Sequence, residues 1–139
     1  MIKNQNILVT QRALILNKDN SLLLYKRRNE DYWELPGGIV NKGESLENGL
    51  NREVLEEVGS SIKSKKLFDV GEFLYPDFEF DNHQKHNVRF VVISYMASLT
   101  STPKVNSSEH KELKWFKKSG LVLVKIHDNS VSAISKWSG

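Results

Sequence analysis

The sequence predicts a mixed α/β (α+β) fold, and three observations lead to this class. Stretches rich in Val, Ile and Leu, which are typical of strands, stand on both sides of a long amphipathic segment with helical spacing. A second, shorter helical pattern ends the sequence. The length of 139 residues suits one domain, which at this size buries about two-thirds of its unfolded surface. We therefore expect a single domain over residues 1–139.

Two strands are predicted before the first helix. Residues 7–16 are rich in Val, Ile, Leu and Thr, and the turn-forming residues 17–20 follow them. A second strand over residues 21–28 begins directly after this turn. Because the connection is so short, we expect the two strands to pair as a hairpin.

The first helix is predicted over residues 46–58. Its apolar residues recur at helical spacing on one side, at Leu46, Leu50, Val54 and Val58. Ser45 is a residue type that caps a first turn, and Gly59 is one that ends a helix. Asn48, Gly49 and Asn51 are poor helix formers, so tertiary contacts must compensate for them.

Two strands are predicted after this helix. The first covers residues 65–75, and we expect Pro76 and Asp77 to break it. Residues 78–86 are then a polar and aromatic loop, which is a plausible place for substrate selection. The second strand, over residues 87–97, is the most continuous apolar run and is expected to be central and buried on both faces for much of its length.

The remaining elements are a short strand and a closing helix. The strand is predicted over residues 111–116, while residues 121–126 fit either a strand or a helix. The helix begins near Asn129. Its expected buried side is formed by Val131, Ile134 and Trp137.

Three carboxylates crowd one edge of the first helix. At 100° per residue, Glu53, Glu56 and Glu57 fall within roughly a third of the circumference. Like charges at these spacings weaken an isolated helix by roughly 0.2–0.5 kcal/mol per pair. A solvated acidic face is one explanation. The other is a hard divalent cation such as Mg²⁺ or Mn²⁺, which takes carboxylate oxygens as ligands. The spacing of the three residues does not choose between them.

A wider pattern surrounds these carboxylates. Counting from Gly38, Glu44 follows after five residues, and seven more residues lead to the run REVLEEVG. This pattern resembles the Nudix box, G-x5-E-x7-R-E-U-x-E-E-x-G-U with U aliphatic, which is the signature of the Nudix hydrolase family. Agreement of this kind at one starting point has a chance on the order of one in a billion. The last aliphatic position is Ser60, and Ile62 is the nearest residue that could take over its packing.

The resemblance implies the Nudix fold, a mixed β-sheet sandwiched between α-helices with a catalytic loop-helix-loop that binds Mg²⁺, with Mn²⁺ as an alternative. The order of predicted strands and helices is the order of that fold. The implied metal ligands are a backbone carbonyl at Gly38 and the carboxylates of Glu53, Glu56 and Glu57. Arg52 and Glu44 are implied to orient these carboxylates and not to react.

The implied reaction is hydrolysis of a pyrophosphate bond in a nucleoside diphosphate linked to another moiety. A nucleoside triphosphate or a related small nucleotide is the expected substrate. The base that takes the proton from water is implied to be Glu53 or an acidic residue of a later loop. Arg27, at the end of the second strand, resembles a phosphate contact of the family, and an exposed strand end explains it equally well.

The segment SEHKELKW resembles the part of many Nudix proteins that precedes the last strand and carries an acidic residue of the active site. Glu109 fits that role best and Glu112 is the runner-up, although either residue also reads as a surface acid. Trp33 stands where the family often has an aromatic residue. We expect it to pack beneath the box and not to stack on a base.

Composition limits the partners of the chain. The net charge of +3 attracts phosphates but does not by itself indicate a nucleic-acid binder. No apolar run approaches the ~20 residues that span a bilayer, and the first residues lack the apolar core of a signal peptide. With no Cys, there is no disulfide or thiolate site. We therefore expect a cytoplasmic location and no membrane partner, with a homodimer as one option.

Two alternatives to a small-nucleotide hydrolase stay open. One is a non-catalytic nucleotide-sensing or interaction module, although all three glutamates that the metal site requires are present. The other is an RNA 5′-end pyrophosphohydrolase. We consider it less well supported, because the sequence has no dense basic patch and no evident row of stacking aromatic residues.

Overall fold

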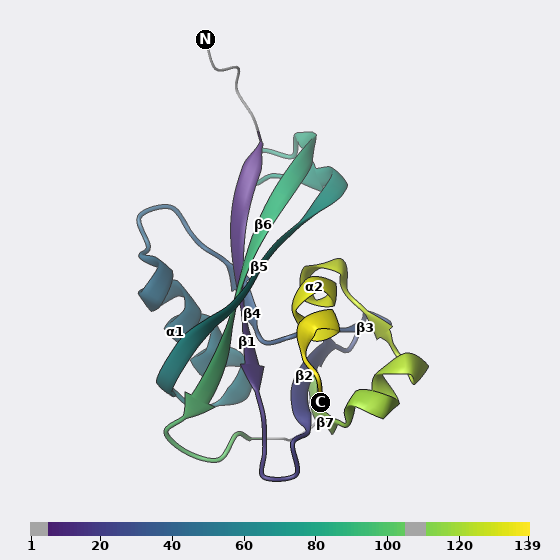
Figure 1. Cartoon of the computed structure of the whole chain (residues 1–139). Helices are drawn as coiled ribbons and strands as arrows, with labels where there is room; N and C mark the ends of the chain where they lie inside the picture. The colour runs from purple at the N-terminus through teal and green to yellow at the C-terminus, as the bar shows by residue number, and fades with distance from the viewer. Residues whose placement is uncertain (1–5, 105–110) are drawn as a thin grey trace.

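A four-stranded mixed sheet forms the centre of the computed structural model, which describes residues 6–104 and 111–139. The strand order is β4-β1-β6-β5. The strands are β1 (Ile7–Ile15), β4 (Gly37–Ile39), β5 (Ile62–Glu79) and β6 (Lys85–Leu99). β1 is parallel to β6 and antiparallel to β4, while β5 and β6 form a long antiparallel ribbon that twists strongly (Figure 1). The predicted mixed sheet is confirmed.

Two smaller sheets complete the strands. β2 (Leu22–Arg27) pairs antiparallel with β7 (Lys111–Phe116), and β3 (Tyr32–Trp33) pairs parallel with β8 (Lys125–Ile126). The predicted hairpin of the first two strands is therefore wrong, because β1 and β2 share only the bridge between Leu16 and Leu22. Both edges of β1 are already occupied, by β4 and by β6, so β2 has to pair elsewhere.

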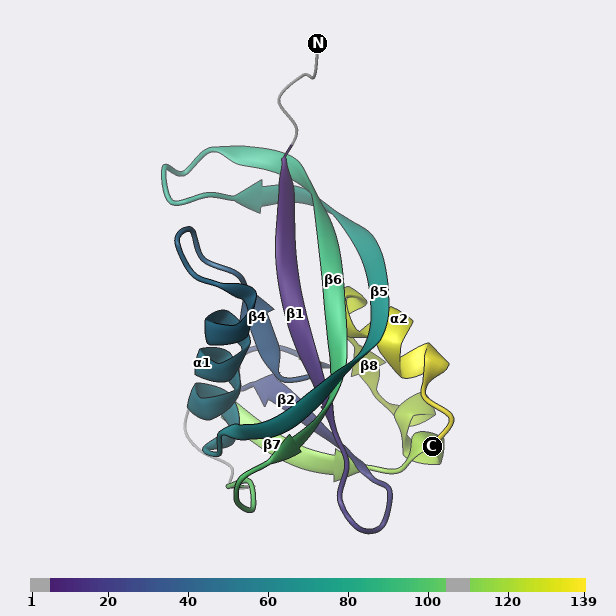
Figure 2. The same ribbon diagram turned by 60° about the vertical axis from the view of Figure 1, so that its left-hand side comes forward.

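Two helices cover opposite sides of the sheets, as Figures 1 and 2 show: α1 (Leu46–Val58) and α2 (Asp128–Lys136). Side chains of β1 alternate between them, since Ala13 and Ile15 pack toward α1 and Leu14 packs toward α2. The core on the α1 side consists of Ala13, Ile15, Leu23, Tyr25, Leu50, Val54, Val58 and Leu113. The core on the α2 side includes Leu14, Leu22, Leu24, Trp33, Leu35, Phe116, Ile134 and Trp137. The predicted arrangement of a sheet between helices is confirmed.

Both predicted ends of α1 are confirmed. The Ser45 hydroxyl accepts a hydrogen bond from the Asn48 backbone N–H at 3.1 Å, which caps the first turn. Gly59 adopts a left-handed backbone with φ of 78° at the other end. Leu50, Val54 and Val58 are buried as expected, but Leu46 in the first turn is 46% exposed.

The departure from the box at Ser60 has a structural explanation. Ser60 is buried, and its hydroxyl donates to the Ser101 carbonyl at 3.0 Å and accepts from the Ser101 N–H at 3.1 Å. The serine therefore ties the exit of α1 to the segment after β6. Ile62 packs against the core on the α1 side, so it does take part in the packing that the aliphatic position would supply.

Three expectations for the second half are corrected. Pro76 and Asp77 do not end β5, because a shift of register between Tyr75 and Phe78 absorbs them and the strand continues to Glu79. The loop expected over residues 78–86 is reduced to the turn at residues 80–84. β6 is central, as predicted, but buried and partly exposed side chains alternate along it, so it is not buried on both faces.

The ambiguous segment over residues 121–126 divides between a 3-10 helix, η1 (Lys118–Leu123), and strand β8. In α2, Ile134 and Trp137 are buried as predicted. Val131 is 48% exposed, so its predicted burial is wrong, and Ala133 takes its place in the core. No helix among the described residues is long and apolar enough to span a membrane.

Candidate active site

The turn before α1 requires its two glycines. Gly37 has a φ of 150°, and a Cβ atom there would lie 1.9 Å from the Gln11 carbonyl oxygen of the adjacent strand β1. A Cβ atom on Gly38 would lie 2.5 Å from the carboxyl carbon of Glu53. The backbone of the turn therefore lies directly against the Glu53 carboxylate, at a distance that only glycine permits.

Glu57 also faces this turn. Its Oε1 accepts a hydrogen bond from the Gly37 backbone N–H at 2.8 Å. Burial raises the pKa of Glu57 to about 8, and the nearby charge of Glu53 adds to the rise, while the Gly37 N–H and Arg12 oppose it. Negative charge at this position is thus poorly compensated by the protein alone.

Arg52 holds the other carboxylates of the box. Its Nε and Nη2 donate to the two oxygens of Glu44 at 2.7 and 3.0 Å, and its Nη1 donates to Glu53 at 2.9 Å. The hydrogen bonds from Arg52, with a further one from the Asn41 N–H, hold the pKa of Glu44 below its usual value. This geometry agrees with the orienting role expected for Arg52 and Glu44.

Gly49 explains how Glu44 reaches Arg52. A Cβ atom on Gly49 would lie 2.8 Å from Glu44 Oε1, so the absence of a side chain inside α1 makes room for the Glu44 carboxylate. The sequence indicates only that Gly49 weakens the helix. The structure shows that the same glycine, which lowers the stability of the helix, lets the Glu44 side chain pack against it.

The three predicted metal-binding glutamates are not arranged as a closed ligand set. Within residues 6–104 and 111–139, no group of three acidic or histidine side chains has the geometry to hold a metal ion. The Glu53 carboxylate accepts a hydrogen bond from Arg52, and the Glu57 carboxylate accepts one from the Gly37 N–H. The Glu56 side chain is 60% exposed, and its Oε2 lies 3.6 Å from Arg52 Nη1. The donor set still fits a hard divalent cation, because it offers carboxylate oxygens beside a glycine turn and includes the Glu57 carboxylate, whose charge is only partly compensated.

A cavity of about 350 Å³ opens beside the glycine turn. One part of its wall is polar and belongs to the box and to neighbouring strands: Thr10, Arg12, Arg27, Glu34, Gly37, Gly38, Asn41, Glu53 and Asn129. The other part is aromatic: Tyr32, Phe73, Tyr75, Phe78, Phe90 and His127. The cavity therefore joins the acidic helix to a surface on which a flat ring could stack.

The aromatic wall continues along the β5–β6 ribbon. Phe73 and Phe90 are stacked with ring centroids 5.0 Å apart and planes 8° from parallel. Phe78 lies edge-on to Phe90 and to Phe80, in the part of the ribbon that projects beyond the rest of the sheet (Figure 2). No such row is evident in the sequence, but the structure brings these aromatic residues together. The row comes from two strands and forms only when they pair.

A buried ion pair forms the floor of the cavity. Arg12 Nη1 lies 2.8 Å from Glu34 Oε1, and the two side chains are only 6% and 9% exposed. Arg12 also donates to the Thr10 hydroxyl at 2.9 Å, and the Asn129 side chain donates to Glu34 Oε1 at 3.3 Å. Burial lowers the pKa of His127 in the same wall. Sequence reasoning missed these residues, and the only signal was a charged residue, Arg12, within a predicted strand.

The other predicted residues are placed as follows. Arg27 lines the cavity and lies within hydrogen-bonding reach of Tyr25. Glu112 pairs with Arg28 at 3.1 Å on the far side of β7 and does not line the cavity. Glu109 lies outside the described residues.

Trp33 is buried, and its ring lies edge-on to Phe116 with centroids 5.0 Å apart. The prediction that it packs in the core is confirmed. It packs on the α2 side, however, and not beneath the box helix as expected.

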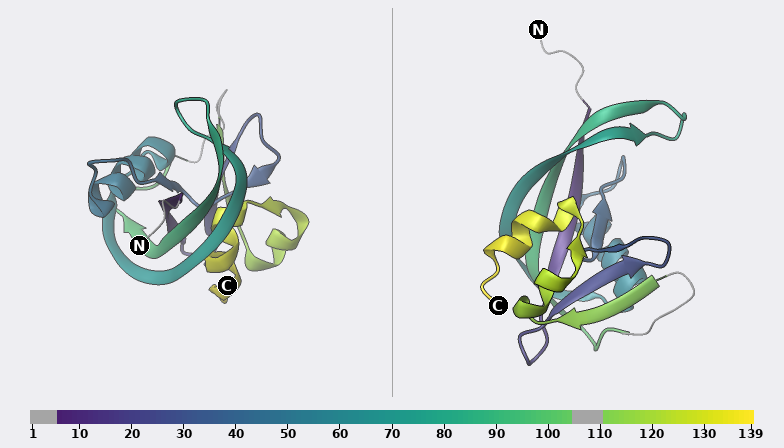
Figure 3. Two further views of the ribbon diagram at one scale, coloured as in Figure 1. Left: turned by 90° about the horizontal axis from the view of Figure 1, so that it is seen from above. Right: turned by 90° about the vertical axis from the view of Figure 1, so that its right-hand side faces the viewer.

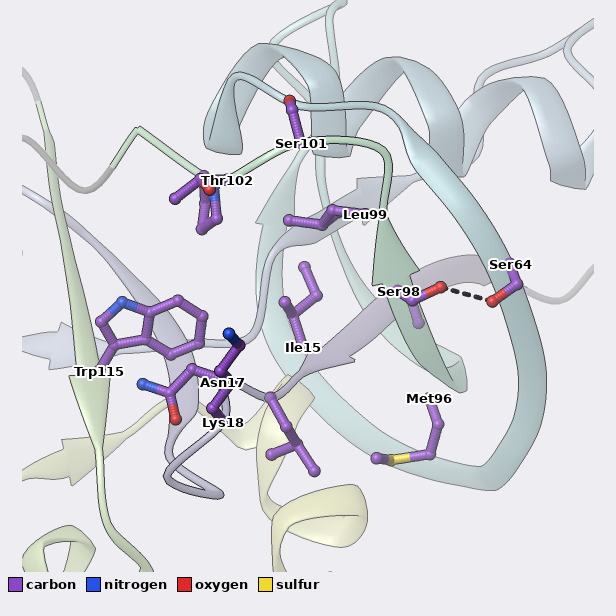
Figure 4. A pocket seen from close by; sticks show the side chains of 13 residues that line it. Ile15, Asn17, Lys18, Ser64, Met96, Ser98, Leu99, Ser101, Thr102 and Trp115 are labelled. Carbon is purple, nitrogen blue, oxygen red and sulfur yellow. Dashed lines mark hydrogen bonds between the residues drawn. The ribbon is translucent and has the colours of Figure 1, made fainter.

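A second cavity of about 760 Å³ lies at the other end of the sheet, between the turn after β1 and the end of β6 (Figure 4). Ile15, Met96, Leu99 and Trp115 give it a mainly apolar wall. None of the box residues lines it. Because the predicted chemistry requires charged groups, we place the candidate active site in the smaller cavity.

The fold and the site together define an α+β domain with a glycine turn and an acidic helix at one cavity. The family model of the NUDIX domain matches residues 6–137 of this chain. The chain belongs to the NUDIX domain family, as the box predicts. Nudix hydrolases in general use divalent metal ions.

Curated proteins that are similar to this chain are named for several different activities. The ADP-ribose pyrophosphatase of Methanocaldococcus jannaschii is 40% identical over 72 residues, which cover 50% of this chain and 41% of that protein. The 8-oxo-dGTP diphosphatase of Buchnera aphidicola is 35% identical over 63 residues, which cover 45% of this chain and 51% of that protein. The matches span about half the length of these curated relatives.

The fold has close counterparts among solved structures. The crystal structure of a MutT NUDIX hydrolase from Burkholderia pseudomallei superposes with a TM-score of 0.73 at 24% identity, covering 96% of this chain and 100% of that one. At this level of identity the likeness concerns the fold.

Proposed function

We propose that this chain hydrolyses a pyrophosphate bond in a small nucleotide, a nucleoside diphosphate linked to another moiety, with Mg²⁺ as its cofactor and Mn²⁺ as a substitute. The observation that carries the proposal is the shared cavity. It has the glycine turn and Glu53 on one side, Arg27 nearby, and an aromatic wall on the other side. A phosphate chain and a flat base can therefore be held in one cavity of about 350 Å³.

The acidic helix is the part of the site that meets the cation. Glu53, Glu56 and Glu57, with a backbone carbonyl at Gly38, are the residues proposed to hold it. A divalent cation bound there offsets phosphate charge and lowers the pKa of a water. Glu57 is the ligand best supported, because the Gly37 N–H and Arg12 compensate the charge of its carboxylate only in part.

The remaining polar residues position the reactants. Arg27 lines the cavity and is proposed to bind a phosphate oxygen. Arg52 and Glu44 keep Glu53 in place through the hydrogen bonds of the guanidinium group. The proton of the attacking water goes to Glu53 or to Glu109, and both stay candidates.

The test is a screen of the purified chain with Mg²⁺ against nucleoside triphosphates, ADP-ribose, sugar nucleotides and dinucleoside polyphosphates. We expect turnover of at least one class, with the released pyrophosphate or phosphate reporting which bond is cut. Glu57→Gln should lower turnover by about 10²–10⁴-fold while the fold is retained. The matched control is Glu47→Gln, an exposed residue of the same helix.

Three results would contradict the proposal. They are turnover without any divalent cation, Glu57→Gln activity within severalfold of the parent, and nucleotide binding with no turnover of any class. The last result would favour the sensing module. For the base, a loss in Glu109→Gln that equals the loss in Glu53→Gln would assign the role to Glu109, and near-normal rates would leave it with Glu53.

RNA 5′ ends are a second candidate substrate because the aromatic row continues beyond the cavity to Phe80 and His86. The charges near the turn of the ribbon favour the small nucleotide, since Asp77, Glu79 and Asp81 outnumber Lys85 there and repel a polyanion. Competition between a 5′-triphosphorylated RNA and a nucleoside triphosphate in one reaction distinguishes the two. We expect the free nucleotide to be consumed first.

A further inference from the structure

One face of the β5–β6 ribbon is rich in exposed apolar side chains and lies on the side of the sheet that α2 does not cover. The pairing register places Leu74, Val70 and Leu67 of β5 beside Arg89, Ile93 and Tyr95 of β6, and the next neighbours on β1 include Ile7. Leu67 is 58% exposed, Val70 57%, Leu74 66% and Ile7 46%. Because residues paired in register share a face, these side chains lie on one exposed surface, which the ion pair between Glu72 and Arg89 crosses at 3.0 Å. We call it the ribbon face.

β5 is also an open edge of the sheet. The strand order ends at β5, and none of the described strands pairs with its outer side. At about 3.3 Å per residue, its 18 residues have a contour length of roughly 50–60 Å. Figure 3 shows that the strand is strongly curved. An edge of this length exposes a row of backbone N–H and C=O groups that can pair with another strand.

Charges along this edge are divided by sign. Lys63, Lys65 and Lys66 lie near its beginning, and Asp77 and Glu79 lie near its end. A second copy running parallel would place lysine opposite lysine, which is unfavourable. A second copy running antiparallel places the basic end of each strand opposite the acidic end of the other. The edge is therefore complementary to itself in one direction only.

We propose that two copies of this chain associate through their β5 edges, antiparallel about a two-fold axis. The two central sheets then continue into each other. Leu67, Val70 and Leu74 of both copies meet at the junction, and the lysine and acidic ends pair across it. Such an interface is isologous, so it closes at two copies and leaves no further edge at β5.

The active-site cavity does not take part in this contact. Phe73 and Tyr75 of β5 line the cavity, and they alternate with Leu74, which points to the ribbon face. Each copy keeps its own cavity, so association does not depend on the proposed hydrolase activity. A monomer and an inactive protein are separate outcomes.

The first experiment is sedimentation velocity of the full chain over a range of concentrations. We expect the parent chain to be a dimer. In Val70→Lys and in Leu74→Lys, the Kd of dimer dissociation should rise by at least about tenfold. Val122→Lys is the matched control, because Val122 is 84% exposed but lies on η1, away from the ribbon face. Circular dichroism checks that the variants are folded.

A charge exchange tests the direction of pairing. The variant Lys63→Glu/Lys65→Glu and the variant Asp77→Lys/Glu79→Lys should each weaken the dimer, and their combination in one chain should restore it. The parent being a monomer at all concentrations would overturn the proposal and leave the ribbon face to a different partner. It is also overturned if Val122→Lys weakens association as much as Val70→Lys, or if the combined charge variant is weaker than both of its parts.

Discussion

The α1 side and the α2 side of the molecule both contain carboxylates in contact with an arginine, but they build these contacts differently. On the α1 side Arg52, Glu53 and Glu44 lie within ten consecutive positions, and the Arg52 side chain is 32% exposed. On the α2 side Arg12 comes from β1 and Glu34 directly follows β3, and their side chains are only 6% and 9% exposed. The first arrangement can be recognised from spacing in the sequence, and the second exists only after folding.

The difference in exposure predicts a difference in role. A partly exposed ion pair contributes little to stability, about 0–1 kcal/mol, because solvent screens it and its side chains lose entropy. Removing one member of a buried pair leaves an uncompensated charge, which costs about 3–5 kcal/mol. We therefore expect changes on the α1 side to act mainly on activity and changes at the cavity floor to act mainly on stability.

The largest expected effect is that of Arg12→Met. It leaves Glu34 buried with only the weak hydrogen bond from Asn129, so the free energy of unfolding should fall by about 3–5 kcal/mol, measured by urea denaturation at neutral pH. The double variant Arg12→Met/Glu34→Leu removes both charges and should recover much of the loss. If the loss of unfolding free energy in the double variant equals the sum of the losses in the two single variants, Arg12 and Glu34 are not energetically coupled. The proposed stabilising role of the buried pair is then contradicted.

The next effect concerns the other side. Arg52→Lys keeps the charge but cannot bond both oxygens of Glu44 while also reaching Glu53, so turnover should fall by about 10–100-fold. The free energy of unfolding should change by less than about 1 kcal/mol. Kinetics and urea denaturation of the same preparation separate the two. A loss of stability as large as that of Arg12→Met would contradict the proposed division of roles.

The same comparison explains what the sequence could predict. Features that depend on neighbours within about twenty residues appear as expected. They are α1, its caps at Ser45 and Gly59, and the contact of Gly38 with Glu53. The cavity floor joins Arg12, Glu34 and Asn129, which are separated by 22 and 95 positions. No local spacing signals such contacts.

Strand pairing was missed for a related reason. The predicted pairing of the first two strands follows from their short connection, but the parallel contact of β1 with β6 takes precedence because it buries the centre of the sheet. The row of aromatic residues on β5 and β6 likewise depends on register. Elements could be predicted from the sequence, whereas their partners required the fold.

A smaller effect is expected at Asp69, which anchors α2 to the sheet. Burial acts to raise the pKa of Asp69, but hydrogen bonds from Lys136 and Ser132 outweigh it, so the pKa is lowered overall. Asp69→Asn should reduce the free energy of unfolding by about 1–2 kcal/mol at pH 7.

The pH dependence of this effect has a definite sign. Since the folded pKa is the lower one, the contribution is fully present above the unfolded value of about 3.9 and is lost as the pH falls through the folded value. The difference between the parent and Asp69→Asn should therefore be constant near neutral pH and shrink below about pH 4. A difference that grows on acidification would contradict the assignment.

The smallest effect is expected for Glu112→Gln. Glu112 pairs with Arg28 at 3.1 Å, both side chains are partly exposed, and the pair lies outside the cavity, so the free energy of unfolding should change by about 0.5 kcal/mol or less. Turnover should stay within severalfold of the parent, because the carboxylate does not line the cavity that holds Glu53. A loss comparable to that of Glu57→Gln would instead show that β7 brings Glu112 to the reacting groups. The acidic machinery would then extend beyond α1, and the division between the two sides of the molecule would have to be redrawn.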